Sequence, residues 1–150
     1  MCKELKYLSL TFTIFLSIIG CEEKIVNQGD VVPKIEFKSI SKNKVKQFTD
    51  SIAIVLSYFD GDGDLGEVNP DSLSLCVRDT RLSKPDYYHL MPLSPVGYKI
   101  NIHGDITIKL KNLFLLSPSP AETTSFEIKV KDRANHFSNL ILTPKIEIIR

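Results

Sequence analysis

Three aspartates at alternate positions of one short segment are the residues best suited to chemistry in this 150-residue chain. Asp60, Asp62 and Asp64 are separated by Gly61 and Gly63. Carboxylates this close repel one another unless a positive charge lies among them, and glycine lets the backbone turn alternate side chains toward one point. Hard oxygen ligands at this spacing suit Ca²⁺, which takes about six to eight oxygens in a flexible geometry. The segment therefore predicts a calcium site with a structural role.

Two further carboxylates, Glu67 and Asp132, are expected to reinforce this ligand set. Glu67 follows in the same segment, and Asp132 begins a later Asp-Arg-Ala-Asn turn. Asp60 and Asp132 are both in phase with the inward residues of the strands before them, so both side chains should point toward the middle of one end of the domain. Asp105, in an expected His-Gly-Asp turn, is placed at the same end. Mg²⁺ fits less well, because it prefers few carboxylates and retained water.

The aspartate spacing resembles the opening of an EF-hand loop but departs from it soon afterwards. The sixth position holds Leu65 where an EF-hand has glycine, and the twelfth holds Asp71 where it has a bidentate glutamate. The flanking segments have the period of strands rather than helices. EF-hand function is therefore not carried over. The alternative to a metal site is an acidic turn that caps a strand and keeps one end of the domain soluble.

The elements that must position these residues are β-strands. From Pro33 onward, apolar residues alternate with polar ones, and no window has convincing helical periodicity. About seven short strands joined by turns predict an all-β, immunoglobulin-like or fibronectin-like sandwich, in which the acidic segment joins the second and third strands. Pro144 should mark a bulge or an edge position, and 80–97 should be a loop. The strands are expected near residues 34–38, 52–58, 73–77, 98–102, 106–111, 126–131 and 139–149.

The first residues have the features of a secretory signal. Lys3 and Lys6 precede an apolar run over 7–19. This run is shorter than the roughly 20 residues that a helix needs to span a bilayer. We therefore expect a signal peptide at 1–20, a flexible lipidated linker at 21–32 and one β-domain at 33–150.

The four residues Ile18-Ile19-Gly20-Cys21 resemble the lipobox of bacterial lipoprotein signal peptides. The resemblance implies that Cys21 is acylated and becomes the new N-terminus, which anchors the protein in the membrane. Several acyl chains at about 0.8 kcal/mol per buried CH₂ make such attachment effectively permanent. The following Glu22 and Glu23 resemble surface-export signals of some Gram-negative lipoproteins, with a solvated tether as the alternative. The expected location is the cell envelope, at the outer membrane, on its periplasmic or surface face.

The mature chain resembles small bacterial lipoproteins with a single immunoglobulin-like domain. Three features carry the resemblance: the aromatic-DGDGD-Leu-Gly turn over 59–66, Gly104 before the Ile-Thr-Ile strand, and the turn over 130–135. The last is similar to the V-x-D-x-A-G-N turn of bacterial immunoglobulin-like repeats, with Asn135 at the usual glycine. The resemblance implies a fold and a location, but no particular activity. We expect a non-catalytic binding or spacer module with an envelope protein or glycan as partner; the alternative is a structural accessory subunit without metal.

The remaining reactive side chains do not indicate an enzyme. Three histidines fall in separate expected loops without metal-ligand spacing: His89, His103 and His136. Cys76 is the one cysteine of the mature domain besides Cys21, so no internal disulfide is expected, and no neighbouring base activates the thiol.

Charge and aromatic residues narrow the class of partner. A net charge of +1 supplies no basic field for nucleic acid. Tyr87 and Tyr88, in the expected long loop, are the best candidates for ligand-binding residues, because exposed aromatics serve as anchors at interfaces. The alternative is that both rings fold back over the edge of the sandwich.

Overall fold

The computed structural model describes residues 30–150, and every regular element in that range is a β-strand. The expected signal peptide, Cys21 and most of the expected linker lie outside the described residues. The strands are β1 (Lys34–Ile40), β2 (Lys44–Lys46), β3 (Ile52–Asp60), β4 (Leu75–Asp79), β5 (Asp86–Tyr88), β6 (Ile102–Leu110), β7 (Ala121–Thr124), β8 (Phe126–Val130), β9 (Ile141–Leu142) and β10 (Ile146–Ile149). No helix that could span a membrane occurs within 30–150.

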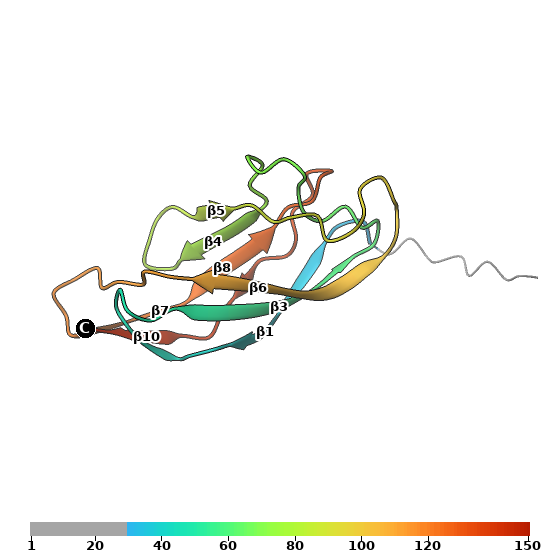
Figure 1. Cartoon of the computed structure of the whole chain (residues 1–150). Helices are drawn as coiled ribbons and strands as arrows, with labels where there is room; N and C mark the ends of the chain where they lie inside the picture. The colour runs from blue at the N-terminus through green and yellow to red at the C-terminus, as the bar shows by residue number, and fades with distance from the viewer. Residues whose placement is uncertain (1–29) are drawn as a thin grey trace, which may run out of the picture.

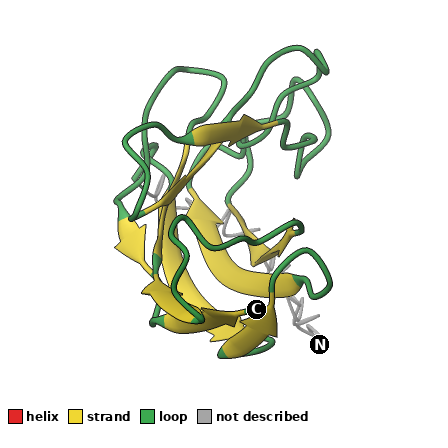
Figure 2. Ribbon diagram, turned by 90° about the vertical axis from the view of Figure 1, so that its left-hand side faces the viewer, coloured by secondary structure: helices red, strands yellow, loops and turns green. Residues whose placement is uncertain are grey.

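The strands form three sheets that make two layers around one core. The orders are β1-β3-β6, β2-β10-β7 and β5-β4-β8-β9, and every pairing is antiparallel except the parallel pair of β2 and β10. Only Ser125 separates β7 from β8, so the sheet β2-β10-β7 continues the four-stranded sheet (Figure 1). Figure 2 shows the two layers from the side. The all-β class is confirmed, and the arrangement is consistent with a β-sandwich.

The core is built from alternate residues of the facing sheets. In β3, Ile52, Ile54 and Leu56 are buried while the residues between them are half-buried. They belong to one hydrophobic cluster with Val77 of β4 and Ile128 of β8. Each fully buried aliphatic side chain contributes about 1.5–3 kcal/mol to folding. The period-two pattern of the sequence therefore marks the true inward faces.

The expected strand around Tyr98 and Ile100 does not form. These side chains are 66% and 46% exposed, and β6 instead runs unbroken through 103–105. Its pairing with β3 puts Gly104 opposite Tyr58, and a Cβ on Gly104 would lie only 3.0 Å from the Tyr58 hydroxyl oxygen. The His-Gly-Asp segment is therefore the interior of a strand, where glycine makes room for a ring, and the prediction of a turn there is wrong.

The described residues 30–150 divide into ten strands rather than about seven. The expected last strand breaks around Pro144: β9 pairs with β8, whereas β10 pairs with β7 and β2. Proline cannot donate to a strand ladder, so the chain changes neighbours there. The expected loop over 80–97 contains the short strand β5, which pairs with β4.

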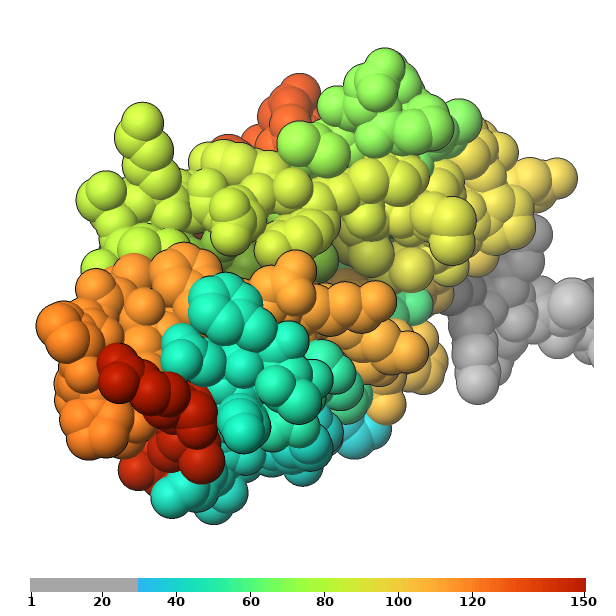
Figure 3. Space-filling view, turned by 60° about the vertical axis from the view of Figure 1, so that its left-hand side comes forward, coloured from blue at the N-terminus to red at the C-terminus, as the bar shows by residue number. Residues whose placement is uncertain are grey.

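The connections gather at two ends of the sandwich (Figure 1). One end carries 61–74, 89–101 and the turn over 131–136. Figure 3 looks toward the opposite end, where the orange chain near 111–120 lies beside the teal chain before β3 and the red C-terminus. Backbone hydrogen bonds join these segments, since the amide of Phe48 donates to Leu113 over 2.9 Å and that of Gln47 to Ile149 over 2.8 Å.

Candidate metal centre

The acidic cluster forms where β3 ends. Asp60 is the last residue of β3 and is fully buried, because it continues the inward alternation of Ile54 and Leu56. Asp62 and Asp64 follow at alternate positions, and one candidate ligand atom from each of the three carboxylates lies within 4.8 Å of the other two. The spacing thus brings three carboxylates together, and this cluster could hold a metal ion.

One oxygen of each carboxylate is buried without a hydrogen-bond partner. These atoms are the Oδ1 atoms of Asp60, Asp62 and Asp64, and within 30–150 only the Ser74 hydroxyl shares this state. An unsatisfied buried polar atom costs about 1–3 kcal/mol, and more when charged, so folded proteins keep few of them. Three such atoms in one cluster are the pattern expected for missing contacts to a cation.

The opposite oxygens of two carboxylates are held by the backbone. The amide of Leu65 donates to Asp60 Oδ2 over 2.9 Å, and the amide of Ala134 donates to Asp64 Oδ2 over 3.1 Å. These bonds join the loop over 60–67, called the acidic loop below, to itself and to the turn after β8. They fix the orientation of the carboxylates while leaving the unpartnered oxygens available to an ion.

The pKa values record how unfavourable the ionised cluster is. Burial, together with the charges of Asp62, Asp64 and Asp132, raises the pKa of Asp60 to about 6, although the hydrogen bond from the Leu65 amide lowers it. Burial, followed by the charges of Asp132 and Asp62, also raises the pKa of Asp64. Like charges and desolvation both disfavour the charged forms. A divalent cation supplies the charge that would stabilise them.

Two glycines let the acidic loop lie directly against the segment 91–100. Gly63 and Gly66 have φ values of +70° and +89°, in the left-handed region that favours glycine. A Cβ on Gly63 would collide with the carbonyl oxygen of Ile100, and one on Gly66 with that of Met91. The segment in which a strand was expected therefore covers the acidic loop.

Gly66→Ala is expected to cost about 2–4 kcal/mol of unfolding free energy, from left-handed strain plus overpacking. The added Cβ would lie 2.7 Å from the carbonyl carbon of Met91 and 2.9 Å from Cα of Pro92. Gly97→Ala is the matched control, because Gly97 has a φ of +90° but no atom within 4 Å of an added Cβ, so only strain of about 1–2 kcal/mol applies. Urea unfolding measures both, and equal costs would contradict close packing at Gly66.

Side chains distant in sequence clamp the same loop. The guanidinium of Arg133 donates to the carbonyl oxygens of Gly66 over 2.8 Å and Gly63 over 3.4 Å. The hydroxyl of Ser94 also donates to Gly63. Leu65 lies between these contacts and is fully buried. Neither of these two side-chain contacts follows from a local sequence motif; the only local signal for Arg133 is its place next to Asp132.

Asp132 is fully buried, as its phase predicted, but it lies outside the group of three. Its two oxygens face His136: the His136 amide donates to Oδ1 over 2.7 Å, and Nδ1 lies 3.0 Å from Oδ2. Asn135 has a φ of +70°, which asparagine tolerates better than most residues. Asp132 thus supports the turn and acts on the cluster through its charge.

Glu67 and Asp105 also lie outside the group of three. The backbone amide of Glu67 donates to Leu90 over 2.7 Å, which ties the loop to the segment after β5. Asp105 is paired with Ser57 inside the sheet and forms a 2.6 Å ion pair with Lys38. Its expected place beside the cluster is wrong, because β6 continues through the predicted turn.

The aromatic pair lies on β5 rather than on an irregular loop. Tyr87 is opposite Cys76 and 53% exposed, whereas Tyr88 is opposite Leu75 and lines a cavity of about 90 Å³ with Phe126. Adjacent residues of a strand point to opposite faces, so the two rings do not form a single binding surface.

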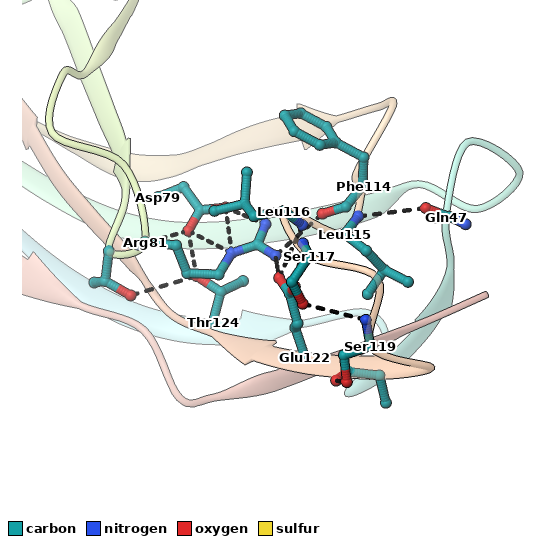
Figure 4. A network of polar contacts seen from close by, with 12 residues as sticks. Gln47, Asp79, Arg81, Phe114, Leu115, Leu116, Ser117, Ser119, Glu122 and Thr124 are labelled. Carbon is teal, nitrogen blue, oxygen red and sulfur yellow. Dashed lines mark hydrogen bonds and ion pairs between the residues drawn. The ribbon is translucent and has the colours of Figure 1, made fainter.

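A second polar network closes the opposite end of the sandwich (Figure 4). Arg81 donates to Asp79 Oδ2 over 2.7 Å, to Glu122 Oε2 over 2.6 Å and to the carbonyl oxygen of Phe114 over 3.1 Å. The hydroxyl of Thr124 also donates to Asp79. The network joins three segments that sequence analysis left unconnected, and its internal pairing suits it to a structural role.

No protein-family model, curated protein or solved structure matches this chain.

Proposed function

We propose that this chain is a lipid-anchored envelope protein whose immunoglobulin-like domain is a non-catalytic binding or spacer module, with calcium at Asp60, Asp62 and Asp64. The single observation that carries the calcium site is the set of three buried carboxylate oxygens without partners. Calcium is favoured over magnesium because it accepts several carboxylates in an irregular protein cage. The ion would hold together the end of the sandwich at which three connections meet.

The strand pairing supports an immunoglobulin-like assignment. The sheet β1-β3-β6 would correspond to strands A, B and E, and β5-β4-β8-β9 to C′, C, F and G. The parallel pair of β2 and β10 would place an A′ strand beside G. On this assignment the acidic loop is the B–C connection and the turn over 131–136 is the F–G connection.

The anchor rests on the lipobox-like residues that end at Cys21. Wild-type protein expressed in bacteria is expected to incorporate labelled palmitate and to partition into the detergent phase of a Triton X-114 extract. Cys21→Ala should abolish incorporation, because it removes the thiol that the lipobox resemblance marks as the lipid acceptor. Cys76→Ala is the matched control and should keep the label, since Cys76 is buried in the domain. A labelled Cys21→Ala protein would refute the anchor.

The alternative is a structural accessory subunit of an envelope complex that needs no metal. The contacts of Arg133 and Ser94 to the acidic loop favour it, because they join the same segments without an ion. A partner recovered from solubilised envelope in calcium but lost in EDTA would favour the binding module. An unchanged partner set would favour the accessory subunit.

A further inference from the structure

We propose that the cation at Asp60, Asp62 and Asp64 is a ligand-binding ion, and that the groove beside it accepts the carboxylate of an acidic sugar. The inference rests on the proposed function, because it requires the cation. It adds a ligand class and a direction of approach to a site that the proposed function treats as structural.

The groove lies on one side of the acidic cluster. It encloses about 300 Å³ and is lined by Asp62, Asp64, Gly97, Tyr98, Lys99, Arg133 and Ala134. Asp60 is fully buried and does not line it. An ion among the three carboxylates would therefore be enclosed by protein on the side of Asp60, and a ligand in the groove would reach it between the side chains of Asp62 and Asp64, whose Oδ1 atoms are buried.

The protein groups at the cluster do not fill all the coordination positions of a calcium ion. The three unpartnered Oδ1 atoms supply three ligands, whereas calcium takes about six to eight. The other oxygens of Asp60 and Asp64 already accept backbone amides. The carbonyl oxygen of Gly63 already accepts bonds from Ser94 and Arg133. Even with the second oxygen of Asp62 as a fourth ligand, two or more positions are left for water or for ligand oxygens that enter through the groove.

The charge of the groove favours a negatively charged ligand only when the cation is bound at the acidic cluster. Lys99 is exposed and forms no ion pair within 30–150, and Arg133 bonds to carbonyl oxygens rather than to carboxylates. These two cations alone do not balance the four negative charges of Asp60, Asp62, Asp64 and Asp132. Two further positive charges from calcium would remove the repulsion of an incoming carboxylate and give it a direct ligand position.

The size and lining of the groove indicate a sugar ring as the bearer of that carboxylate. A space of about 300 Å³ is at the small end of ligand sites. Tyr98 lines the groove and is 66% exposed, so its ring offers an apolar face for packing. A uronic acid combines a flat apolar ring face, a carboxylate for the ion and Lys99, and hydroxyl oxygens for the remaining positions.

Terbium luminescence of the full chain in detergent micelles separates binding of the ion from binding of the sugar to that ion. Tb³⁺ occupies calcium sites and is excited through nearby tyrosine, and its decay times in H₂O and D₂O give the number of bound waters. We expect at least about two waters on the bound ion, of which galacturonate displaces one or more while galactose displaces none. Lys99→Ala should weaken galacturonate about threefold to tenfold without changing Tb³⁺ affinity. Lys109→Ala, an exposed lysine of β6, is the matched control and should change neither.

The outcomes distinguish this inference from the proposed function. Absence of sensitised emission would overturn the cation site itself. A bound ion without waters, or with waters that galacturonate does not displace, would overturn the ligand-binding role and leave a structural ion. Equal displacement by N-acetylaspartate would overturn the assignment to a sugar and point to an acidic peptide instead.

Discussion

Millimolar calcium is expected to raise the melting temperature of this protein by roughly 10 °C, and Asp60→Asn is expected to abolish that rise. A ligand that binds only the folded state stabilises it by about 2.7 kcal/mol at a hundredfold excess over its Kd. In a domain of this size each 1 kcal/mol shifts the melting temperature by about 4 °C. Differential scanning calorimetry in calcium and in EDTA measures both proteins.

Without the metal, the same substitution should not lower the stability of the protein. Asp60 is fully buried, one of its oxygens has no partner, and its pKa is raised to about 6 by burial first and then by neighbouring carboxylates. At neutral pH the folded metal-free protein therefore holds an unfavourable charge. Asp60→Asn removes it, so in EDTA the variant should be at least as stable as wild type.

Asp71→Asn is the matched control for this experiment. Asp71 is exposed, lies in the same connection and is outside the group of three. Its variant should keep the full response to calcium. A wild-type protein that does not respond, or an Asp60→Asn variant that responds equally, would leave the acidic turn without metal as the better interpretation.

Arg81→Met is expected to destabilise the domain by about 3–5 kcal/mol, with or without calcium. Arg81 and Asp79 have side chains only 13% and 11% exposed, and the same guanidinium also reaches Glu122 and the carbonyl oxygen of Phe114 (Figure 4). Removal of one partner from a largely buried pair leaves the other charge uncompensated. Burial raises the pKa of Asp79, but the bonds from Arg81 and Thr124 outweigh burial and hold that pKa below its ordinary value.

Arg78→Met is the matched control for charge and size. Arg78 pairs with Glu127 on the outer face of the sheet, where the side chains are 30% and 26% exposed. More exposed pairs contribute about 0–1 kcal/mol, so this variant should lose much less. Denaturant unfolding compares the two variants. Equal losses of unfolding free energy would show that the network around Arg81 stabilises the domain no more than the more exposed Arg78 pair.

The pH dependence of stability gives a second readout for the Arg81 network. Hydrogen bonds from the Ser117 hydroxyl and the Leu116 amide, together with Arg81, lower the pKa of Glu122 to about 2. Because this folded pKa lies below the ordinary value, the contribution of Glu122 is complete above about pH 4.5 and is lost as pH falls toward 2. Arg81→Met should make that loss smaller, although the bonds from Ser117 and Leu116 remain.

The amino-acid sequence by itself determined the features that depend on local periodicity. Alternation with period two identified the all-β class and the buried faces of β3, β6 and β8. The same phase, continued to the end of β3 and one step beyond β8, placed Asp60 and Asp132 inside the protein. The Asp-Gly spacing brought Asp62 and Asp64 to Asp60, because alternate side chains separated by glycine can turn to one side within a single loop.

Only the tertiary structure decided which distant segments support that cluster. Arg133 reaches Gly63 across 70 positions, and Arg81 reaches Glu122 across 41. The exposed apolar residues around Tyr98 had the pattern of a strand, yet the chain there covers the acidic loop instead of pairing. Such contacts follow from how the two sheets and their connections meet, and no local pattern encodes them. The sequence therefore predicted a cluster of carboxylates, whereas the fold decided what encloses it and on which side it opens.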